Sequence, residues 1–144
     1  MIAGRFITLE GGEGTGKSTL IAGLAYMLRA RGMACIVTRE PGGTPLAEQV
    51  RDLALNPPEG ESWSPLAQAL LMNAAREDHL ERQIRPALRA GRWVLCDRFA
   101  DSTRAYQSID GVSMNTLLAF ERAVVKDTRP DLTLILDADP ELLR

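Results

Sequence analysis

FITLEGGEGTGKSTLIAGL, residues 6–24, is the stretch that decides the fold class of this chain. Its centre, residues 11–18, matches the pattern G-x-x-x-x-G-K-[ST]. The apolar run 6–9 predicts a strand before the glycines, and the run 20–24 predicts a helix after them. A phosphate-binding loop needs this order of strand, loop and helix, whereas a ligand-free glycine turn does not. The stretch therefore predicts a phosphate site in an α/β protein.

The residue types suit a polyphosphate. Backbone N–H groups approach phosphates closely only where side chains are absent, which explains the glycines. Lys17 is expected to reach the β- and γ-phosphates, Ser18 to ligate Mg²⁺, and the helix start to add its positive end. Only one other lysine, Lys126, occurs in the chain. The predicted ATP-binding residues are Gly11, Gly12, Glu13, Gly14, Thr15, Gly16, Lys17, Ser18 and Thr19.

Composition restricts the function classes. The 144 residues are 45% hydrophobic and 25% charged, which is typical of one globular domain spanning 1–144. The net charge of −2 provides no basic field for nucleic acid. No apolar run is long enough to cross a membrane, and the first residues do not resemble a secretory signal. We therefore expect a cytoplasmic protein, with Cys35 and Cys96 as buried free thiols in strands.

Unbroken apolar runs at 5–9, 34–38, 92–96 and 132–136 predict strands that are covered on both faces. Helical patterns fill the intervals, so the expected fold is a doubly wound parallel sheet with flanking helices. The helices are expected at 20–31, 46–55, 64–89, 101–108 and 113–126, and another is expected to begin at Asp139-Pro140-Glu141. Pro86 is expected to kink or shorten the long helix. Its predicted apolar stripe is Leu66, Leu70, Ala74, Leu80, Ile84 and Leu88.

Asp97 and Arg98 follow the third predicted strand, on the edge of the sheet where ligands bind. A phosphate-loop enzyme needs a carboxylate there to hold Mg²⁺, and Arg98 would reach a phosphoryl group. Taken alone, the two residues could equally form a surface ion pair. The glycine-rich loop favours the catalytic interpretation, with Ser18 and Asp97 as the metal ligands.

Three further blocks join the loop: residues 38–44 (TREPGGT), 74–76 (AAR) and 97–107 (DRFADSTRAYQ). In this order the four blocks resemble the bacterial thymidylate kinases, P-loop enzymes that phosphorylate thymidine monophosphate (dTMP) with ATP. The resemblance extends from Phe6 to Pro140. It implies a nucleoside monophosphate kinase fold, Mg²⁺ as cofactor, and a homodimer that uses one face of the helix at 64–89.

The resemblance also implies roles for single residues. Glu13 matches an acidic loop position near the sugar 3′-hydroxyl and the metal, and joins Lys17 and Arg98 as a catalytic candidate. Glu40 and Arg51 match positions beside the acceptor nucleotide, and Arg76 matches an arginine that binds a thymine carbonyl. Arg98 matches the group that holds the acceptor phosphate. The segment that reads the pyrimidine edge corresponds to Ser102, Thr103, Tyr106 and Gln107.

Spacing supports this last set, because positions 102, 103, 106 and 107 share one helical face and could surround a single base. An ordinary polar surface is the alternative. Met72 stands where the family usually stacks an aromatic ring on thymine, one turn before Arg76. A thioether also packs on aromatic rings, although Met72 as core filler is the alternative. His79, the only histidine, lies in the charged run 76–79 and is expected to be solvated or hydrogen-bonded rather than a ligand or base.

One branch of the family carries an arginine within the loop, which this sequence lacks. The resemblance then implies that the missing charge comes from a lid after the fourth strand, and we expect this lid, the last strand and the last helix of the family to lie beyond Arg144. The expected reaction converts dTMP and ATP into dTDP. Another nucleoside monophosphate or deoxynucleoside kinase, or a folded but inactive kinase fragment, is the alternative. A guanine-nucleotide switch is disfavoured, because no N-K-x-D run occurs.

Overall fold

The computed structural model describes residues 4–137, and the helix start expected at 139–141 lies outside them. Four parallel strands form one sheet in the order β2-β3-β1-β4. They are β1 (Phe6–Glu10), β2 (Cys35–Arg39), β3 (Trp93–Asp97) and β4 (Leu132–Ile135). Each lies within about one residue of the strand expected from its apolar run.

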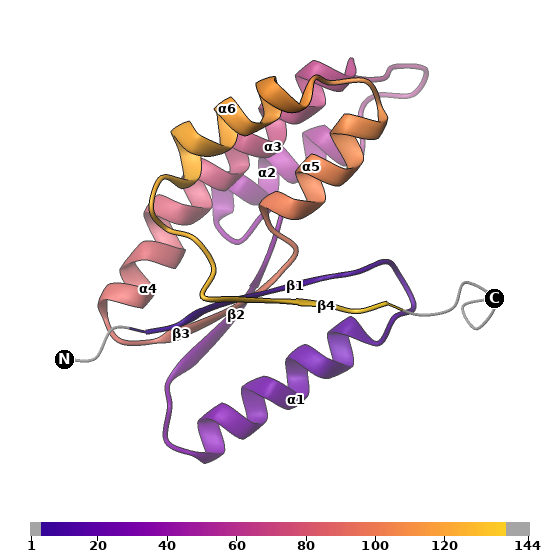
Figure 1. The fold of residues 1–144 in the computed structure, drawn as a ribbon. Helices are drawn as coiled ribbons and strands as arrows, with labels where there is room; N and C mark the ends of the chain where they lie inside the picture. The colour runs from indigo at the N-terminus through magenta and orange to yellow at the C-terminus, as the bar shows by residue number, and fades with distance from the viewer. Residues whose placement is uncertain (1–3, 138–144) are drawn as a thin grey trace.

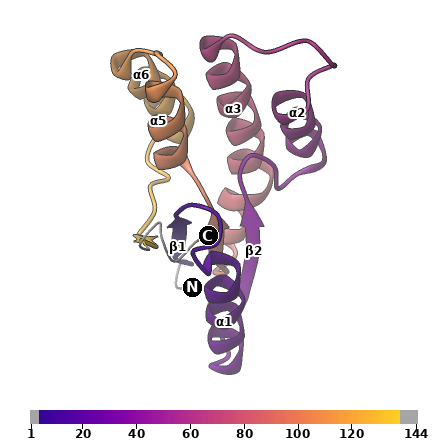
Figure 2. The same ribbon diagram turned by 90° about the vertical axis from the view of Figure 1, so that its right-hand side faces the viewer.

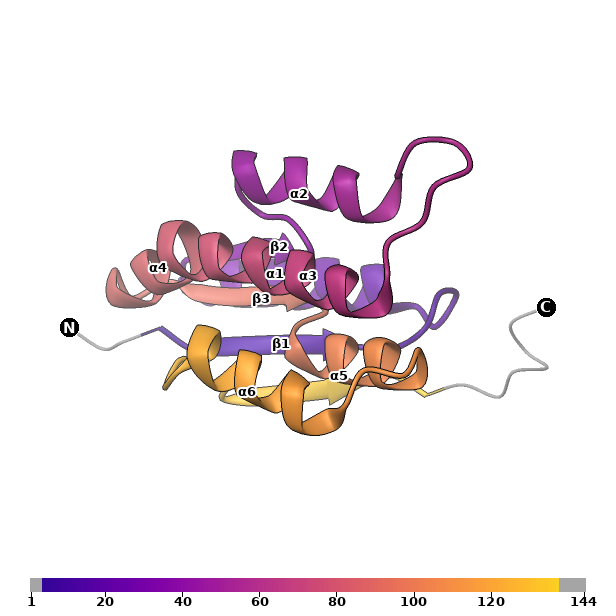
Figure 3. The same cartoon turned by 90° about the horizontal axis from the view of Figure 1, so that it is seen from above.

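Helices cover both faces, which confirms the doubly wound α/β class (Figure 1). Helix α1 (Lys17–Ala30) lies alone on one face, and the other helices lie on the opposite face (Figure 2). These are α2 (Pro45–Leu55), α3 (Pro65–His79), α4 (Arg85–Arg89), α5 (Ala100–Ile109) and α6 (Met114–Val125). Seen from above, α2 lies outside α3, while α5 and α6 lie over β1 and β4 (Figure 3). Within residues 4–137, no helix combines the length and the apolar character needed to cross a membrane.

The strand order creates a crevice between β1 and β3. From β1 the chain crosses by α1 to the edge strand β2, whereas from β3 it crosses by α5 and α6 to β4 on the other side. The two connections leave in opposite directions from neighbouring strands. Such a switch point opens a crevice at the carboxyl ends of the strands, where the glycine-rich loop and Asp97 are found.

Alternation along the strands divides the core into two parts. On the α1 face, Leu9, Cys35 and Leu95 pack against Ile21 and Ala25 of α1. On the opposite face, Phe6, Val94 and Cys96 pack against a second buried set: Leu80, Ile84, Ala87, Phe99, Ala100 and Val125. Cys35 and Cys96 are buried free thiols, as expected. Because side chains alternate with period two, even-numbered residues of β1, β2 and β3 point toward α3 to α6.

The expected long helix at 64–89 is wrong as one regular helix. Five residues, Leu80–Ile84, form a wider π-turn between α3 and α4. Pro86 stands in the first turn of α4, where its missing N–H matters least. On the N-terminal side of the π-turn, α3 buries polar side chains, whereas Leu80, Ile84 and Ala87 pack into the core. π-turns of this kind are frequent at functional sites.

The expected apolar stripe is correspondingly wrong in its first half. Leu66 and Leu70 are about half exposed and Ala74 is exposed, whereas Leu80 and Ile84 are fully buried and Leu88 is partly buried. The buried side chains of α3 are instead Ala69, Asn73, Ala75, Arg76 and His79. A largely polar buried face on α3 means that this helix supplies functional groups rather than core.

Candidate active site

The loop between β1 and α1 forms a cavity of about 410 Å³, here called the loop cavity. Eight of the nine predicted ATP-binding residues line it, all except Gly11. The last loop residue, Gly16, has φ 84° at the N-cap of α1, a left-handed conformation that only glycine adopts freely. The loop therefore delivers the first N–H groups of α1 to the cavity, which is the arrangement that binds anions.

Lys17 is almost fully buried at the base of the loop cavity. Its Nζ donates to the Gly11 carbonyl at 3.1 Å and lies 2.8 Å from Oδ1 of Asp97. Gly11 thus contributes a carbonyl that holds the lysine. Asp97 faces the α1 side of the sheet, as its odd position in β3 requires, and so meets Lys17. The ammonium group is positioned before any anion arrives.

Ser18 and Asp97 both line the loop cavity, so the two expected metal ligands lie together. A hydroxyl and a carboxylate are hard oxygen donors, which Mg²⁺ prefers. Across residues 4–137, no three side chains of His, Cys, Asp or Glu gather into a metal-binding group. Mg²⁺ usually takes one or two protein ligands plus substrate phosphates and water. The donor set therefore fits a magnesium ion carried with a nucleotide.

A second cavity, of about 480 Å³, opens beside the first and is here called the inner cavity. All nine residues expected to bind the acceptor line it: Glu40, Arg51, Met72, Arg76, Arg98, Ser102, Thr103, Tyr106 and Gln107. They come from the end of β2, from α2, α3 and α5, and from the turn after β3. A larger cavity, of about 890 Å³, follows α1 and β2 and contains only Ser18 and Asp97 of the predicted site residues.

Four residues line both cavities: Glu13, Glu40, Arg51 and Arg98. Arg98 has φ 70°, and its backbone N–H donates to the Leu9 carbonyl at 2.9 Å, which turns the chain sharply after β3. Its Nη1 donates to the Tyr106 hydroxyl at 2.9 Å. Burial opposes the charge of Arg98, but the Tyr106 hydrogen bond and nearby carboxylates outweigh it and raise the pKa of Arg98. The guanidinium therefore stays a cation between the two cavities.

Arg51 completes a group of cations at the boundary between the cavities. Its Nη1 donates to the Pro41 carbonyl at 2.8 Å. Burial, followed by repulsion from Arg39 and Arg98, lowers the pKa of Arg51. Converging like charges are unfavourable until an anion neutralises them. Their arrangement indicates that an anionic group binds at this boundary.

Two residues that the sequence analysis did not name as site residues support the inner cavity: Glu10 lies behind it and Phe99 lines it. Glu10, the last residue of β1, accepts hydrogen bonds from the Phe99 amide at 3.0 Å and from the Ser102 hydroxyl. Burial raises the pKa of Glu10, against the effect of these hydrogen bonds and of Lys17 and Arg98. Glu10 thus attaches the start of α5 to β1. Its even position in the strand was the signal, because it directs the carboxylate away from the loop.

Phe99 is the second of these residues, and it lies beneath Arg76. The guanidinium carbon of Arg76 lies 5.2 Å from the centre of the Phe99 ring, and the Nη2 of Arg76 donates to the Thr103 hydroxyl at 2.7 Å. Thr103 and Gln107 are buried, while Tyr106 is half exposed beside Arg98. The expected shared face of α5 therefore lies along the inner cavity, which agrees with the four residues lining it.

His79, the only histidine of the chain, agrees with one of the two alternatives that the sequence left open. It was expected to be solvated or hydrogen-bonded, and it is hydrogen-bonded but fully buried. Its Nδ1 lies 2.7 Å from Oε2 of Glu40, a carboxylate of the inner cavity. The charged run 76–79 gave no sign of its burial, which arises because the end of α3 packs against Thr38 of β2.

Comparisons with known proteins identify the family of the chain. Residues 9–143 match the family model described as thymidylate kinase. The chain is 56% identical over 140 residues to a thymidylate kinase of Bradyrhizobium diazoefficiens, covering 96% of this chain and 61% of that relative. It is 51% identical over 142 residues to one of Alcanivorax borkumensis, covering 98% and 68%. This chain thus spans between three fifths and about two thirds of the length of these relatives.

The comparison of folds also indicates a thymidylate kinase. The crystal structure of the thymidylate kinase from Ehrlichia chaffeensis superimposes with a TM-score of 0.85 at 37% identity, covering 98% of this chain and 80% of that one. The order of the four sequence blocks, the paired cavities and these matches lead to one conclusion: this chain belongs to the thymidylate kinase family.

Proposed function

We propose that this chain transfers the γ-phosphoryl group of ATP to the 5′-phosphate of dTMP and so forms dTDP. The observation that carries the proposal is the contact between the two cavities, which share Glu13, Glu40, Arg51 and Arg98. Phosphoryl transfer requires a donor and an acceptor held in line, and the protein contributes mainly position and charge. ATP would place its phosphates in the loop cavity, and dTMP would occupy the inner cavity.

The cations have separate tasks in this scheme. Lys17 and the N–H groups of the loop hold the donor phosphates, and Arg98 meets the acceptor phosphate and the group in transfer. Ser18 and Asp97 would hold the Mg²⁺ that comes with ATP, and the bound ion would supply positive charge to the phosphate oxygens. The acceptor oxygen is already ionised near neutral pH, so no general base is required. Glu13, at the shared boundary, is available to the acceptor sugar or to the metal.

The base would be recognised deeper in the inner cavity. Arg76 would donate to a thymine carbonyl, and Ser102, Thr103, Tyr106 and Gln107 would surround the pyrimidine edge. Met72 lines the same cavity, so its thioether is available to pack on the ring. Packing of this kind contributes about 0.3–1.5 kcal/mol, which is weaker than a well-placed aromatic stack.

The test is an acceptor panel with the purified chain. Turnover is measured with Mg·ATP and each of dTMP, dUMP, dCMP, dAMP, dGMP and thymidine. The proposal expects the highest kcat/KM for dTMP and none for thymidine, which lacks the acceptor phosphate. A preference for another monophosphate would support a different nucleotide kinase. Binding of dTMP without turnover would indicate an inactive kinase portion.

We further propose that the chain forms a cytoplasmic homodimer through the outer surfaces of α2 and α3. These helices pack on each other and expose large apolar side chains: Leu46, Leu53, Leu66 and Leu70. An apolar surface of this kind on a globular protein favours contact with another protein. Sedimentation equilibrium would show twice the monomer mass, and replacing Leu53 and Leu70 by glutamate would shift it toward the monomer.

A further inference from the structure

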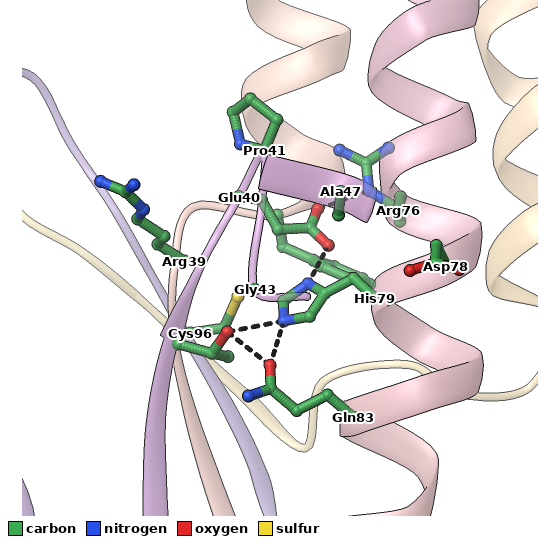
Figure 4. Close-up of polar contacts among 12 residues, drawn as sticks. Arg39, Glu40, Pro41, Gly43, Ala47, Arg76, Asp78, His79, Gln83 and Cys96 are labelled. Carbon is green, nitrogen blue, oxygen red and sulfur yellow. Dashed lines mark hydrogen bonds and ion pairs between the residues drawn. The ribbon is translucent and has the colours of Figure 1, made fainter. Parts of the chain in front are cut away.

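His79 occupies a position that a packing residue would not need. It ends α3, is fully buried, and is surrounded by polar atoms from three elements. Its Nδ1 lies 2.7 Å from Oε2 of Glu40, and its Nε2 lies 2.6 Å from the Thr38 hydroxyl and 2.9 Å from Oε1 of Gln83. Figure 4 shows the ring between Glu40 and Gln83. A carboxylate oxygen only accepts, so Nδ1 carries the hydrogen.

Glu40 is held at both oxygens. The Nε of Arg76 donates to Oε1 at 2.7 Å, and His79 holds Oε2. The side chains of Glu40 and Arg76 are each only 4% exposed, so water has little access to the pair. With one partner on each oxygen, the carboxylate has a single orientation. A buried ion pair of this kind is costly unless its remaining hydrogen-bonding atoms also find partners, and His79 supplies the partner of Oε2.

Arg76 in turn is directed by this carboxylate. Its Nε is committed to Glu40 and its Nη2 to Thr103, while the guanidinium lies over the Phe99 ring. Nη1 and the second Nη2 hydrogen are the donors left for a ligand in the inner cavity, which Arg76 lines. Rotation of the Glu40 carboxylate would rotate the guanidinium with it. His79 therefore controls the direction of Arg76 without touching the cavity itself.

The glycine-rich turn after β2 lies against the imidazole. Gly43 has φ 96°, and a Cβ at this position would collide with Cδ2 and Nε2 of His79 and approach the Thr38 hydroxyl at 2.7 Å. The neighbouring Thr44 hydroxyl donates to Oδ2 of Asp78 at 2.5 Å. The ring is thus enclosed by the turn, by β2 and by its own helix. These contacts hold the ring beside Glu40.

We propose that His79 is a positioning residue for the acceptor base, because it fixes the Glu40 carboxylate that aims Arg76 into the inner cavity. The proposal rests on the proposed function, in which Arg76 binds the base. His79 does not touch substrate. Its effect is expected on the acceptor and not on ATP.

The first experiment compares three variants of the chain. His79→Leu removes both polar contacts, and His79→Asn keeps an amide donor at the place of Nδ1. Gln83→Leu is the matched control, because it removes a partner of Nε2 and leaves the Glu40 contact. The affinity for dTMP is measured by calorimetry, the KM for ATP by turnover, and folding by thermal unfolding.

We expect His79→Leu to weaken dTMP binding by about tenfold to hundredfold, the range for loss of a hydrogen bond to a charged group. His79→Asn should recover most of the affinity, and the KM for ATP should change by less than about twofold in both. Gln83→Leu should leave dTMP affinity near wild type. Equal losses in His79→Leu and His79→Asn, or parallel losses for dTMP and ATP, would overturn the proposal.

A double-mutant cycle with Arg76→Lys separates positioning from general stability. If His79 acts through Arg76, adding His79→Leu to Arg76→Lys should weaken dTMP binding by less than about twofold further. If the loss of dTMP affinity in the double variant equals the product of the two single losses, His79 does not act through Arg76. Should His79→Leu fail to fold, the pair His79→Asn and His79→Gln replaces it, since Gln places its amide nearer to Nε2. Asparagine should then bind dTMP more tightly than glutamine, and the reverse order would overturn the proposal.

The cycle also distinguishes the two proposals. If the wild-type chain prefers another monophosphate to dTMP, the proposed function fails. The same cycle is then measured with the preferred nucleotide, and coupling between His79 and Arg76 would still support the positioning role.

Discussion

Lys17 combines burial, a carbonyl contact and a carboxylate contact at the base of the loop cavity. A cation held in this way needs no reorganisation when phosphates bind, and such preorganised charge is usually the largest single contribution to catalysis. The chain has only one other lysine, Lys126, which is exposed at the end of α6. This contrast makes the role of Lys17 open to a direct test.

Lys17→Met should reduce kcat by about 10²–10³-fold or more, by analogy with the loss of other preorganised donors. Lys126→Met makes the same chemical change far from the cavities and should leave turnover within about twofold of wild type. Steady-state kinetics with saturating Mg·ATP and dTMP measures both. Full turnover by Lys17→Met would remove the lysine from the mechanism.

At the scale of elements, α3 shows both what sequence reveals and where it stops. The glycine-rich loop, the strand ends and the four sequence blocks are local signals. They are sufficient to predict the four strands and to name candidate residues that line two cavities in the structure. The π-turn at Leu80–Ile84 is not local, because it depends on how the helix meets the sheet. A regular period carried through it assigned Leu66 and Leu70 to the core.

Two leucine-to-alanine changes on either side of this boundary test the corrected stripe. Leu80→Ala should lower the free energy of unfolding by about 2–5 kcal/mol, because Leu80 is fully buried and leaves a cavity. Leu66→Ala, on the exposed side, should change it by about 0.5 kcal/mol or less when both changes are made in the monomeric Leu53→Glu, Leu70→Glu background. Urea unfolding of both variants measures the difference. Similar decreases in the free energy of unfolding for both variants would mean that Leu66 and Leu80 belong to one buried stripe of a regular helix.

Asp78 accepts a hydrogen bond from Thr44, the N-cap of α2, and we expect this contact to make stability depend on pH. The Thr44 hydroxyl, and then the guanidinium of Arg82, lower the pKa of Asp78. The folded-state pKa therefore lies below the unfolded value, so this contribution is present above the unfolded pKa and is lost as pH falls through the folded one. Asp78→Asn should be less stable than wild type by about 1 kcal/mol at pH 7. The difference in the free energy of unfolding between wild type and Asp78→Asn should become smaller below about pH 4.

Urea unfolding at several pH values measures this gap. The exposed Glu59 provides a control, since Glu59→Gln should follow the wild-type profile throughout. A gap between wild type and Asp78→Asn that stays constant down to pH 3 would mean that the charge of Asp78 is not its cause.

At the scale of the whole molecule, the two cavities adjoin but use mostly different residues. Ligands of the native state stabilise it by mass action. At about 100 times its Kd, dTMP should raise the free energy of unfolding by about 2.7 kcal/mol, and Mg·ATP should add a similar amount at the same ratio. Thermal unfolding with each ligand and with both measures the two contributions. Glu59→Gln, at an exposed position away from the cavities, should show the same two increases in stability. If dTMP and Mg·ATP together stabilise the chain no more than either ligand alone, the two ligands do not occupy separate sites.

The alternation of side chains in the sheet has one more consequence, for insertions and deletions. Asp97 faces α1 and holds Lys17, while Glu10 and Glu40, one position out of phase, face the other helices. These three strands are in register, with Leu9 and Arg39 both opposite Asp97. Removing a single residue from β3 would exchange its two faces, since the pleat has period two. Such a shift of the strand would send the partner of Lys17 into the apolar core, so we expect that β3 tolerates no change in length.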